Sequence, residues 1–305
     1  MEIVKPLFQI LAAALLAPLL PGVVNRVKAV FAGRKGPPLE QLYYDLIKLL
    51  RKAPVYSRTS TWVFKAGPIA GFAALMTALA MLPFAGRPAA LAFEGDFIFL
   101  VYLLGLARFG TVLAALDTGS AFEGMGASRE MQFAVFAEPA FFLGLAALAR
   151  ITGEGSLAGM FGALTGETWR TAAPVLALLT ASFFIVLLAE NSRVPADDPN
   201  THLELTMIHE AMVLDHSGPE LAYILYGASL KLWLFGAVIG SMVLPRHSGS
   251  WASDSGMFLL VMFGVAAGVG VVESVLARLR LTKVPYLLIT AFAFSALGLI
   301  FQMAR

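Results

Sequence analysis

The chain has 305 residues, of which 58% are hydrophobic and only 14% are charged, and its mean hydropathy is +0.78. Soluble domains contain about 45–50% apolar and about 25% charged residues, so this composition excludes a soluble globular protein and predicts an integral membrane protein. The net charge of +2 does not distinguish between classes of protein or partner. Because the chain contains no cysteine, it can neither hold an iron–sulfur cluster through thiolates nor form a disulfide. Redox chemistry would then belong to a partner or to a bound cofactor.

Eight mostly apolar stretches are long enough to cross a bilayer, which takes about 20 residues. They predict an all-α membrane protein with a single transmembrane domain over residues 1–305 and with spans at 3–24, 63–85, 97–117, 130–150, 172–190, 221–244, 257–277 and 285–304. The first stretch is too long for the apolar part of a signal peptide, and no basic segment precedes it. We therefore expect it to be retained as a span.

The lysines and arginines between the spans predict the orientation. The odd-numbered loops contain thirteen of them and the opposite side contains six. Because loops rich in lysine and arginine stay in the cytoplasm, the odd loops are expected there, including 25–62, 118–129 and 191–220. An even number of spans then places both termini on the outer, periplasmic side of a cytoplasmic (inner) membrane.

Two helices are predicted outside the spans. The stretch LEQLYYDLIKLLRK at 39–52 has leucines at helical spacing and basic residues on another side, which favours an amphipathic helix at the cytoplasmic interface. An ordinary loop helix without a function explains the same pattern. In the fifth loop, Asp198 and Pro199 are typical of a helix start and Gly218 of a helix end, which predicts a helix over 199–216.

The stretch ENSRVPADDPNTHLELTMIHEAMVLDHSG at 190–218 is the most polar part of the chain. It lies between two apolar spans and contains three histidines, one arginine and six carboxylates, namely Glu190, Asp197, Asp198, Glu204, Glu210 and Asp215. A segment of this composition must lie in water or against a partner protein. We interpret it, together with the other cytoplasmic loops, as a docking and coupling surface.

Ionisable residues within spans are costly and usually mark a pathway or a paired site. The candidates are Arg108, Asp117, Glu138, Glu190, Lys231 and Glu273. Acidic and basic members can pair across helices, which favours a proton relay or a charge-coupling chain. The alternative is a set of static ion pairs, with the residues near span ends reaching toward the interface.

The histidines do not form a metal-binding pattern. His202, His209 and His216 are seven residues apart, so a helix would separate neighbours by about 10 Å. Val213 stands where a zinc-protease motif would place its second histidine after His209. Asp215, His216 and Ser217 are contiguous, which is not how a catalytic triad is arranged. We expect neither a metal site nor a free-standing hydrolase.

Several stretches resemble one family. They are GRKGPPLEQLYYDLIKLLRK at 33–52, LDTGSAFEGMGASREMQFAVFAEP at 116–139, the 190–218 stretch, SLKL at 229–232 and ESVLARLRL at 273–281. They are similar to the membrane subunit shared by respiratory complex I, the NADH-quinone oxidoreductase, and by the energy-converting group 4 nickel–iron hydrogenases, including formate hydrogenlyase. LDTGS with GASRE resembles the hydrogenase branch more than complex I.

The resemblance implies a non-catalytic subunit of a redox-driven proton or sodium pump, which anchors soluble electron-transfer subunits to the membrane. The implied partners are hydrogenase-like large and small subunits, which carry the [NiFe] and iron–sulfur clusters, and antiporter-like membrane subunits in the same lipid bilayer. No nucleic acid and no cofactor of its own are implied for this chain. The residues implied in docking or in a quinone-like cavity are Arg34, Asp45, Lys48, Arg129, Glu130, Arg193, Asp197, Glu204, Glu210 and Asp215.

The chain departs from the family pattern in two places. Ala196 stands between Pro195 and Asp197 where the family has phenylalanine, and His216 stands before Ser217 where the family has tyrosine. Both changes alter the wall of a quinone cavity, which argues against quinone binding by this chain. They also favour a distinct subgroup, whose soluble partner need not be a standard hydrogenase.

Three alternatives stay open. The first is the corresponding subunit of complex I, with a genuine quinone site. The second is a stand-alone secondary transporter, which would show inverted repeats and interrupted helices, and no convincing repeat relates the two halves of the chain. The third is a structural anchor without proton traffic, which would leave the glutamates within the spans unexplained.

Overall fold

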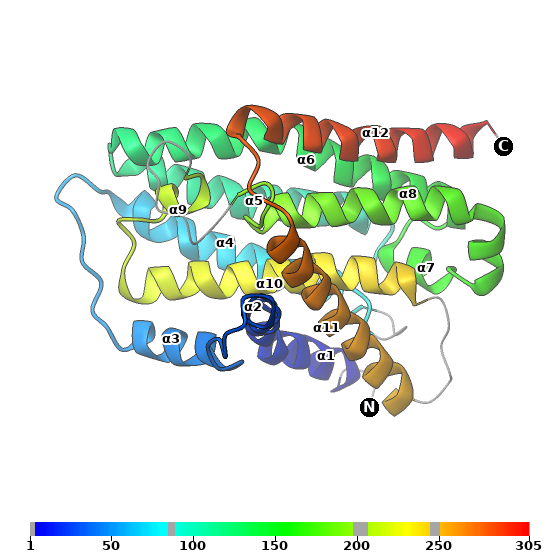
Figure 1. The fold of residues 1–305 in the computed structure, drawn as a ribbon, viewed down its shortest axis with the longest axis horizontal. Coiled ribbons are helices and arrows are strands. Elements are labelled where there is room, and N and C mark those ends of the chain that lie inside the picture. Colours follow the sequence, from blue (N-terminus) through cyan, green and yellow to red (C-terminus); the bar gives the residue numbers. More distant parts are fainter. Residues whose placement is uncertain (1–3, 85–88, 198–206, 245–250, 305) are drawn as a thin grey trace.

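A computed structural model describes residues 4–84, 89–197, 207–244 and 251–304 of the chain. These residues form a bundle of helices (Figure 1) and no β-strand. The elements are α1 Val4–Leu16, α2 Leu19–Phe31, α3 Gln41–Leu50, α4 Trp62–Met81, α5 Asp96–Asp117, α6 Ala121–Thr152, α7 Leu157–Gly162, α8 Gly166–Glu190, α9 His209–Met212, α10 Gly218–Val243, α11 Trp251–Val275, the short 3-10 helix η1 Leu281–Lys283, and α12 Val284–Met303.

The predicted number of spans is confirmed. Within the described residues, eight helical segments are long and apolar enough to cross a membrane. The start of α1 and the end of α12 lie at one end of the bundle, whereas α3 and α9 lie at the other (Figure 1). This arrangement agrees with an even number of crossings, and the side of the membrane that each end faces stays a prediction.

The first span, predicted over 3–24, runs over Gln9–Phe31 and includes a break between α1 and α2. Pro18 lacks an N–H and cannot donate to the carbonyl of Ala14. The Tyr226 hydroxyl donates to that carbonyl instead at 2.9 Å, and the Tyr43 hydroxyl donates to the carbonyl of Leu15. α2 is seen end-on in Figure 1 while α1 lies across the view, so the chain changes direction at this break.

The predicted loop at 118–129 is wrong for most of its length, since α6 already begins at Ala121. The turn is confined to Thr118, Gly119 and Ser120, and Gly119 takes the φ of +71° that favours glycine. The residues after it, AFEGMGASRE, include no proline or β-branched residue, and Gly124 and Gly126 lower the helix propensity without preventing a helix. Arg129 and Glu130 therefore lie on a helix rather than on a loop.

The two helices predicted outside the spans have different outcomes. A helix in the first loop is confirmed as α3, which buries Leu46 and leaves Tyr44, Ile47 and Leu50 exposed. Its position at the membrane interface stays a prediction. Of the helix predicted over 199–216, residues 198–206 lie outside the described residues, and the described remainder is helical only in α9. Turns follow Met212 because the chain must reverse before α10 begins at Gly218.

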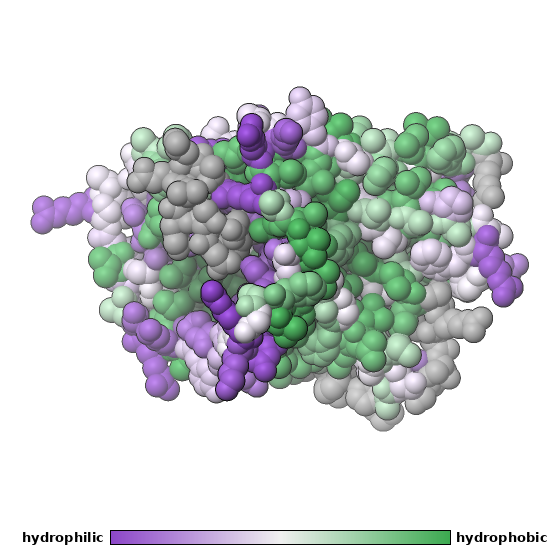
Figure 2. Space-filling model, viewed as in Figure 1, coloured by the Kyte–Doolittle hydropathy of each residue, from purple (hydrophilic) through white to green (hydrophobic). Residues whose placement is uncertain are grey.

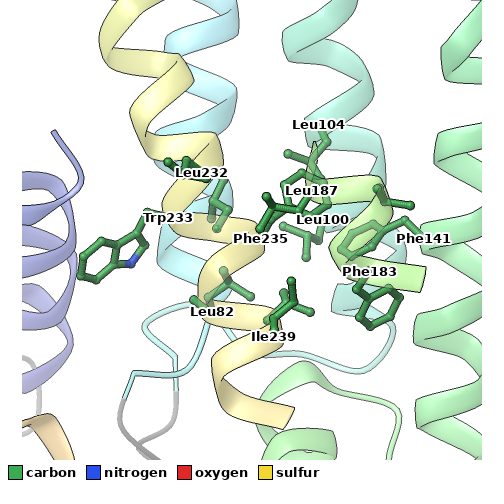
Figure 3. Packing of buried hydrophobic residues seen from close by; sticks show 14 of the residues in the cluster. Leu82, Leu100, Leu104, Phe141, Phe183, Leu187, Leu232, Trp233, Phe235 and Ile239 are labelled. Atoms are coloured by element: carbon green, nitrogen blue, oxygen red, sulfur yellow. The ribbon is translucent and has the colours of Figure 1, made fainter. Parts of the chain in front are cut away.

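α10 is the central helix of the bundle. It is 67% buried within its most apolar window, more than any other span. In Figure 3, Phe235 points toward Leu100 and Leu187, whereas Trp233 points away from them on the other side of α10. The Phe235 ring lies 5.0 Å from that of Phe141, between ring centroids. A helix that is apolar on all sides is expected to be enclosed by its neighbours, and this position brings Lys231 into the interior.

α4 and α5 pack backbone to backbone through glycines. A Cβ placed on Gly110 would lie 2.7 Å from the carbonyl oxygen of Gly67. Small residues at such crossings let two membrane helices approach closely. The contact keeps α5, which carries Arg108, against α4.

We expect Gly110→Ala to lower the melting temperature of the purified chain in detergent, because the added methyl group must push α4 away. Overpacking of this kind costs about 1–3 kcal/mol. The matched control is Gly264→Ala on α11, where nothing lies within 4 Å of an added Cβ. It should leave the melting temperature unchanged or raise it slightly, and equal losses in the two variants would contradict the packing described.

Candidate functional site

Five charged side chains from four helices meet inside the bundle. The Arg108 side chain on α5 is 4% exposed and contacts three carboxylates. Its Nε lies 3.2 Å from Glu130 Oε1, and its two terminal nitrogens contact Glu138 on α6 and Glu190 at the end of α8. Lys231 on α10 places Nζ 3.3 Å from Glu190 Oε2 and 2.9 Å from the Glu190 carbonyl oxygen. We call these five residues the Arg108 network.

The chemistry of the side chains accounts for this arrangement. A guanidinium has five donors and no acceptor, so several carboxylates can share it. Glu190 ends α8, where the last carbonyls have no partner within the helix and attract a cation such as Lys231. The Arg108 network contains three carboxyl groups and two cations. It would therefore carry one net negative charge if every group were ionised, a state that burial disfavours.

A cavity of about 70 Å³, which we call the chamber, adjoins the Arg108 network. Arg108, Glu130, Glu190 and Lys231 line part of its wall, and the remainder is mostly apolar, including Phe72, Leu75, Met212 and Ile224. A water molecule needs roughly 10–15 Å³ of such space and two to four polar partners, so the chamber has the room and the polar groups for several waters.

A second group of ion pairs lies between α2, α11 and residues 191–197. The buried Glu273 carboxylate forms ion pairs with Lys28 Nζ at 2.7 Å and with Arg193 Nη1 at 3.4 Å. Arg278 Nη2 contacts Asp197 Oδ1 at 2.7 Å. We call these residues the second ion cluster. Glu273, a candidate for the proton path, thus lies here and makes no ion pair with the Arg108 network among the described residues.

Asp117, another candidate for the path, holds the start of α4. Its carboxylate accepts hydrogen bonds from the backbone N–H of Thr61 at 2.6 Å and of Phe64 at 3.2 Å, and from the Thr61 hydroxyl at 2.7 Å. These hydrogen bonds satisfy backbone N–H groups that have no partner within the helix at its start. The structure thus brings four of the six candidate path residues together and separates Asp117 and Glu273 from them.

The candidate docking residues are spread over the end of the bundle that carries α3 and α9. Arg34 and Lys48 are exposed, and Asp45 accepts a hydrogen bond from Gln41 at 3.0 Å. Arg129 donates to the carbonyl of Met207 at 2.7 Å. Hydrophilic side chains gather toward this end on the face shown in Figure 2, whereas apolar side chains cover much of the rest of that face.

The acidic stretch is only partly described. Glu210 lies half-buried on α9, and the Asp215 N–H donates to Glu123 Oε1 at 3.2 Å. Glu204 lies outside the described residues. Asp198 and His202 also lie outside them.

The chain matches the family model described as NADH dehydrogenase over residues 4–304. The chain belongs to the NADH dehydrogenase family. It is 30% identical over 310 residues to formate hydrogenlyase subunit 4 of Escherichia coli (strain K12), with 100% of both chains covered. It is 28% identical to hydrogenase-4 component C of the same strain, covering 99% of this chain and 96% of that one.

More distant members of the family include a subunit of the NADH-quinone oxidoreductase of Rubrobacter xylanophilus. The identity is 26% over 240 residues, which cover 76% of this chain and 70% of that one. A chain in the solved structure of the membrane-bound sulfane sulfur reductase, an archaeal respiratory membrane complex, has the same fold. Its TM-score is 0.83 at 20% identity, covering 99% of this chain and 100% of that one. The resemblance inferred from the sequence is confirmed, and the chain is a multi-pass membrane protein.

Sequence reasoning placed Glu130 on the docking surface, whereas the fold places it in the Arg108 network. Glu130 and Glu138 are eight residues apart and so share a helix face, a signal that appears only once α6 is known to begin before Glu130. His209 lines the chamber and Glu123 is 1% exposed. Glu123 was not singled out from the sequence, and His209 was considered only as a metal ligand and rejected, because no local pattern marks either as part of a buried polar site.

His216 anchors the end of the first loop to α10. Its buried ring stacks on Phe64 of α4 with 4.0 Å between ring centroids, and neither ring nitrogen has a hydrogen-bond partner among the described residues. The next residue, Ser217, accepts a hydrogen bond from the N–H of Val55 at 2.9 Å. Burial lowers the pKa of His216 to about 4. The aromatic ring at this position therefore stays uncharged at neutral pH.

We expect Arg108→Gln to destabilise the chain by about 3–5 kcal/mol, because it leaves buried carboxylates without their cation. Among the ion pairs of the described residues, Glu130 pairs with Arg108 alone. Arg108→Gln/Glu130→Gln should therefore be more stable than the sum of the two single changes implies. Thermal unfolding of the four chains in detergent at one pH measures this coupling, and strictly additive losses would rule it out.

The pKa of His216 also predicts how stability depends on pH. Because its folded pKa of about 4 lies below the ordinary 6.5, the unfolded chain binds more protons between these values. The contribution of the neutral ring is complete above about pH 6.5 and declines as the pH falls toward about 4. His216→Phe keeps an aromatic ring against Phe64 and removes the titration. It should lose less melting temperature than the wild type between pH 7.5 and pH 5, and parallel losses would contradict the assignment.

Proposed function

We propose that this chain is the membrane-anchor and coupling subunit of a multisubunit redox-driven ion pump of the formate hydrogenlyase or membrane-bound hydrogenase type. Full-length similarity to formate hydrogenlyase subunit 4 and hydrogenase-4 component C supports this assignment. The observation that carries it is the Arg108 network, a buried set of ionisable groups directly below the proposed docking end. Electron transfer and its metal clusters belong to the soluble partner subunits.

The proposed mechanism is electrostatic. Glu190 is the last residue of α8, and residues 191–197 lead directly from it into the acidic stretch. A change of charge in a docked partner would change how strongly the Glu190 carboxylate interacts with Arg108 and with Lys231. Because interactions between charges are strong where the effective dielectric constant is low, such a shift changes which carboxyl group of the network holds a proton.

Glu138 is where we propose that the path leaves this subunit. Its side chain is 40% exposed, although it lies near the middle of α6 beside the exposed apolar residues Tyr102, Leu106 and Val135. A carboxylate that faces lipid at this depth is costly, so a polar partner is expected to cover it. We propose that an antiporter-like membrane subunit covers Glu138 and receives the proton from it.

The remaining assignments follow from the same proposal. We place the end with α3 and α9 on the cytoplasmic side of the inner membrane, because the odd loops hold most of the lysines and arginines. The chamber would hold water that connects the network to this side. A quinone site, as in the corresponding complex I subunit, is the competing use of the same cavity, favoured by its apolar wall of Phe72, Leu75 and Ile224.

The test begins with purification of the complex in mild detergent, followed by mass spectrometry and metal analysis. A nickel-bearing large subunit with iron–sulfur proteins supports the hydrogenase type. A cluster-rich complex without nickel points to complex I or to a hydrogenase-derived relative with another electron donor. A chain that purifies alone would support the transporter alternative instead. Photolabelling with a quinone analogue distinguishes the two uses of the chamber, because only a quinone site would be labelled.

We expect Glu138→Gln and Glu190→Gln to abolish proton translocation while the complex still transfers electrons, because each change removes a proton-binding carboxylate. The complex is reconstituted in liposomes with a pH-sensitive dye, and hydrogen, formate, reduced ferredoxin and NADH are tried in turn as donors. Glu154→Gln, at an exposed position after α6, is the control and should pump normally. Wild-type proton-to-electron ratios in both network variants would refute the coupling role.

A further inference from the structure

His209 is a titratable residue on the chamber wall that does not belong to the Arg108 network. It begins α9 and lines the chamber together with Glu130 and Lys231. Within the described residues no hydrogen bond is made by its ring, which lies on the chamber wall. Its segment belongs to the connection between α8 and α10, on the docking side of the network.

The position of His209 is fixed from two directions. Its backbone N–H donates to Asp197 Oδ2 at 3.3 Å, and Asp197 also pairs with Arg278 in the second ion cluster. On the other side, Arg129 of α6 holds the carbonyl of Met207. A Cβ placed on Gly126 of α6 would lie 2.8 Å from the carbonyl oxygen of Ile208, so the backbone just before His209 rests directly on α6. The backbone of His209 is therefore held beside the chamber.

Burial is the largest influence on His209 and lowers its pKa below the ordinary value. The charges around the ring are mixed in sign. Glu130 on α6 and Asp197 in the loop favour its protonated form, Lys231 on α10 disfavours it, and Arg108 and Glu190 line the same chamber. The ring is then neutral at neutral pH, with one nitrogen that donates and one that accepts. Such a ring can take a proton on one side and release another on the opposite side.

We propose that His209 is the proton-transfer residue that joins the docking side of the chamber to the Arg108 network. Its unprotonated nitrogen takes a proton from the docking side, and its other nitrogen releases a proton to the Glu130 carboxylate across the chamber. The imidazole ends neutral in the opposite tautomer, and Glu130 gains one proton. This inference rests on the proposed function, since it supplies the entry step of that proton path.

The test uses the purified complex in liposomes, with proton translocation and electron transfer measured together. His209→Ala should lower the rate of proton translocation by about 100-fold, the scale of a lost general acid–base group. Added imidazole should restore translocation, and the restored rate should rise with the fraction of imidazole that is neutral. A structural role for His209 would not respond to imidazole in this way.

His209→Asn is the second variant, because it keeps a polar side chain of similar reach that cannot titrate. We expect the His209→Asn complex to assemble and to fail in proton translocation. If His209→Ala does not assemble, His209→Asn alone tests whether His209 transfers the proton. Translocation at the wild-type ratio in His209→Asn overturns the inference, as does an assembled His209→Ala complex that imidazole does not restore. Glu138→Gln and Glu190→Gln in the same assay distinguish a failure of this inference from a failure of the proposed function, since normal pumping in both of these variants would refute the proposed function itself.

Discussion

The buried guanidinium of Arg108 is the interaction on which the rest of the structure depends. It is shared by carboxylates from α6 and α8, and Lys231 of α10 completes the arrangement. Burying several charges is tolerated only when each has a partner of opposite sign. The four helices that supply these groups must therefore keep their mutual positions, and the glycine contact between α4 and α5 helps to hold Arg108 in place.

Residues 191–197 connect the two groups of buried charge. They begin next to Glu190 in the Arg108 network and contain Arg193 and Asp197, which pair with Glu273 and Arg278. The segment is thus attached to α8 at one end, and its side chains pair with α11 and with Arg278, which follows α11. A displacement of the docking surface would act on both ion groups, which gives a physical route from a partner subunit to the interior.

The two departures from the family pattern now have a structural context. Ala196 is 3% exposed and packs within the core beside the second ion cluster. His216 stacks on Phe64 and leaves its ring nitrogens unpartnered among the described residues. Ala196 and His216 are both buried, so the packing at these two positions is closed.

The sequence by itself determined the fold class, the number of spans and the identity of the charged residues within them, because hydrophobic length and the cost of buried charge act locally. It could not determine where α6 begins, since AFEGMGASRE suits either a loop or a helix. Only the tertiary structure decided which charges meet. Arg108 and Glu190 are 82 residues apart, and their contact depends on how α5 and α8 pack. The same packing separated Glu273 and Asp117 from the network and brought Glu130 and His209 to the chamber.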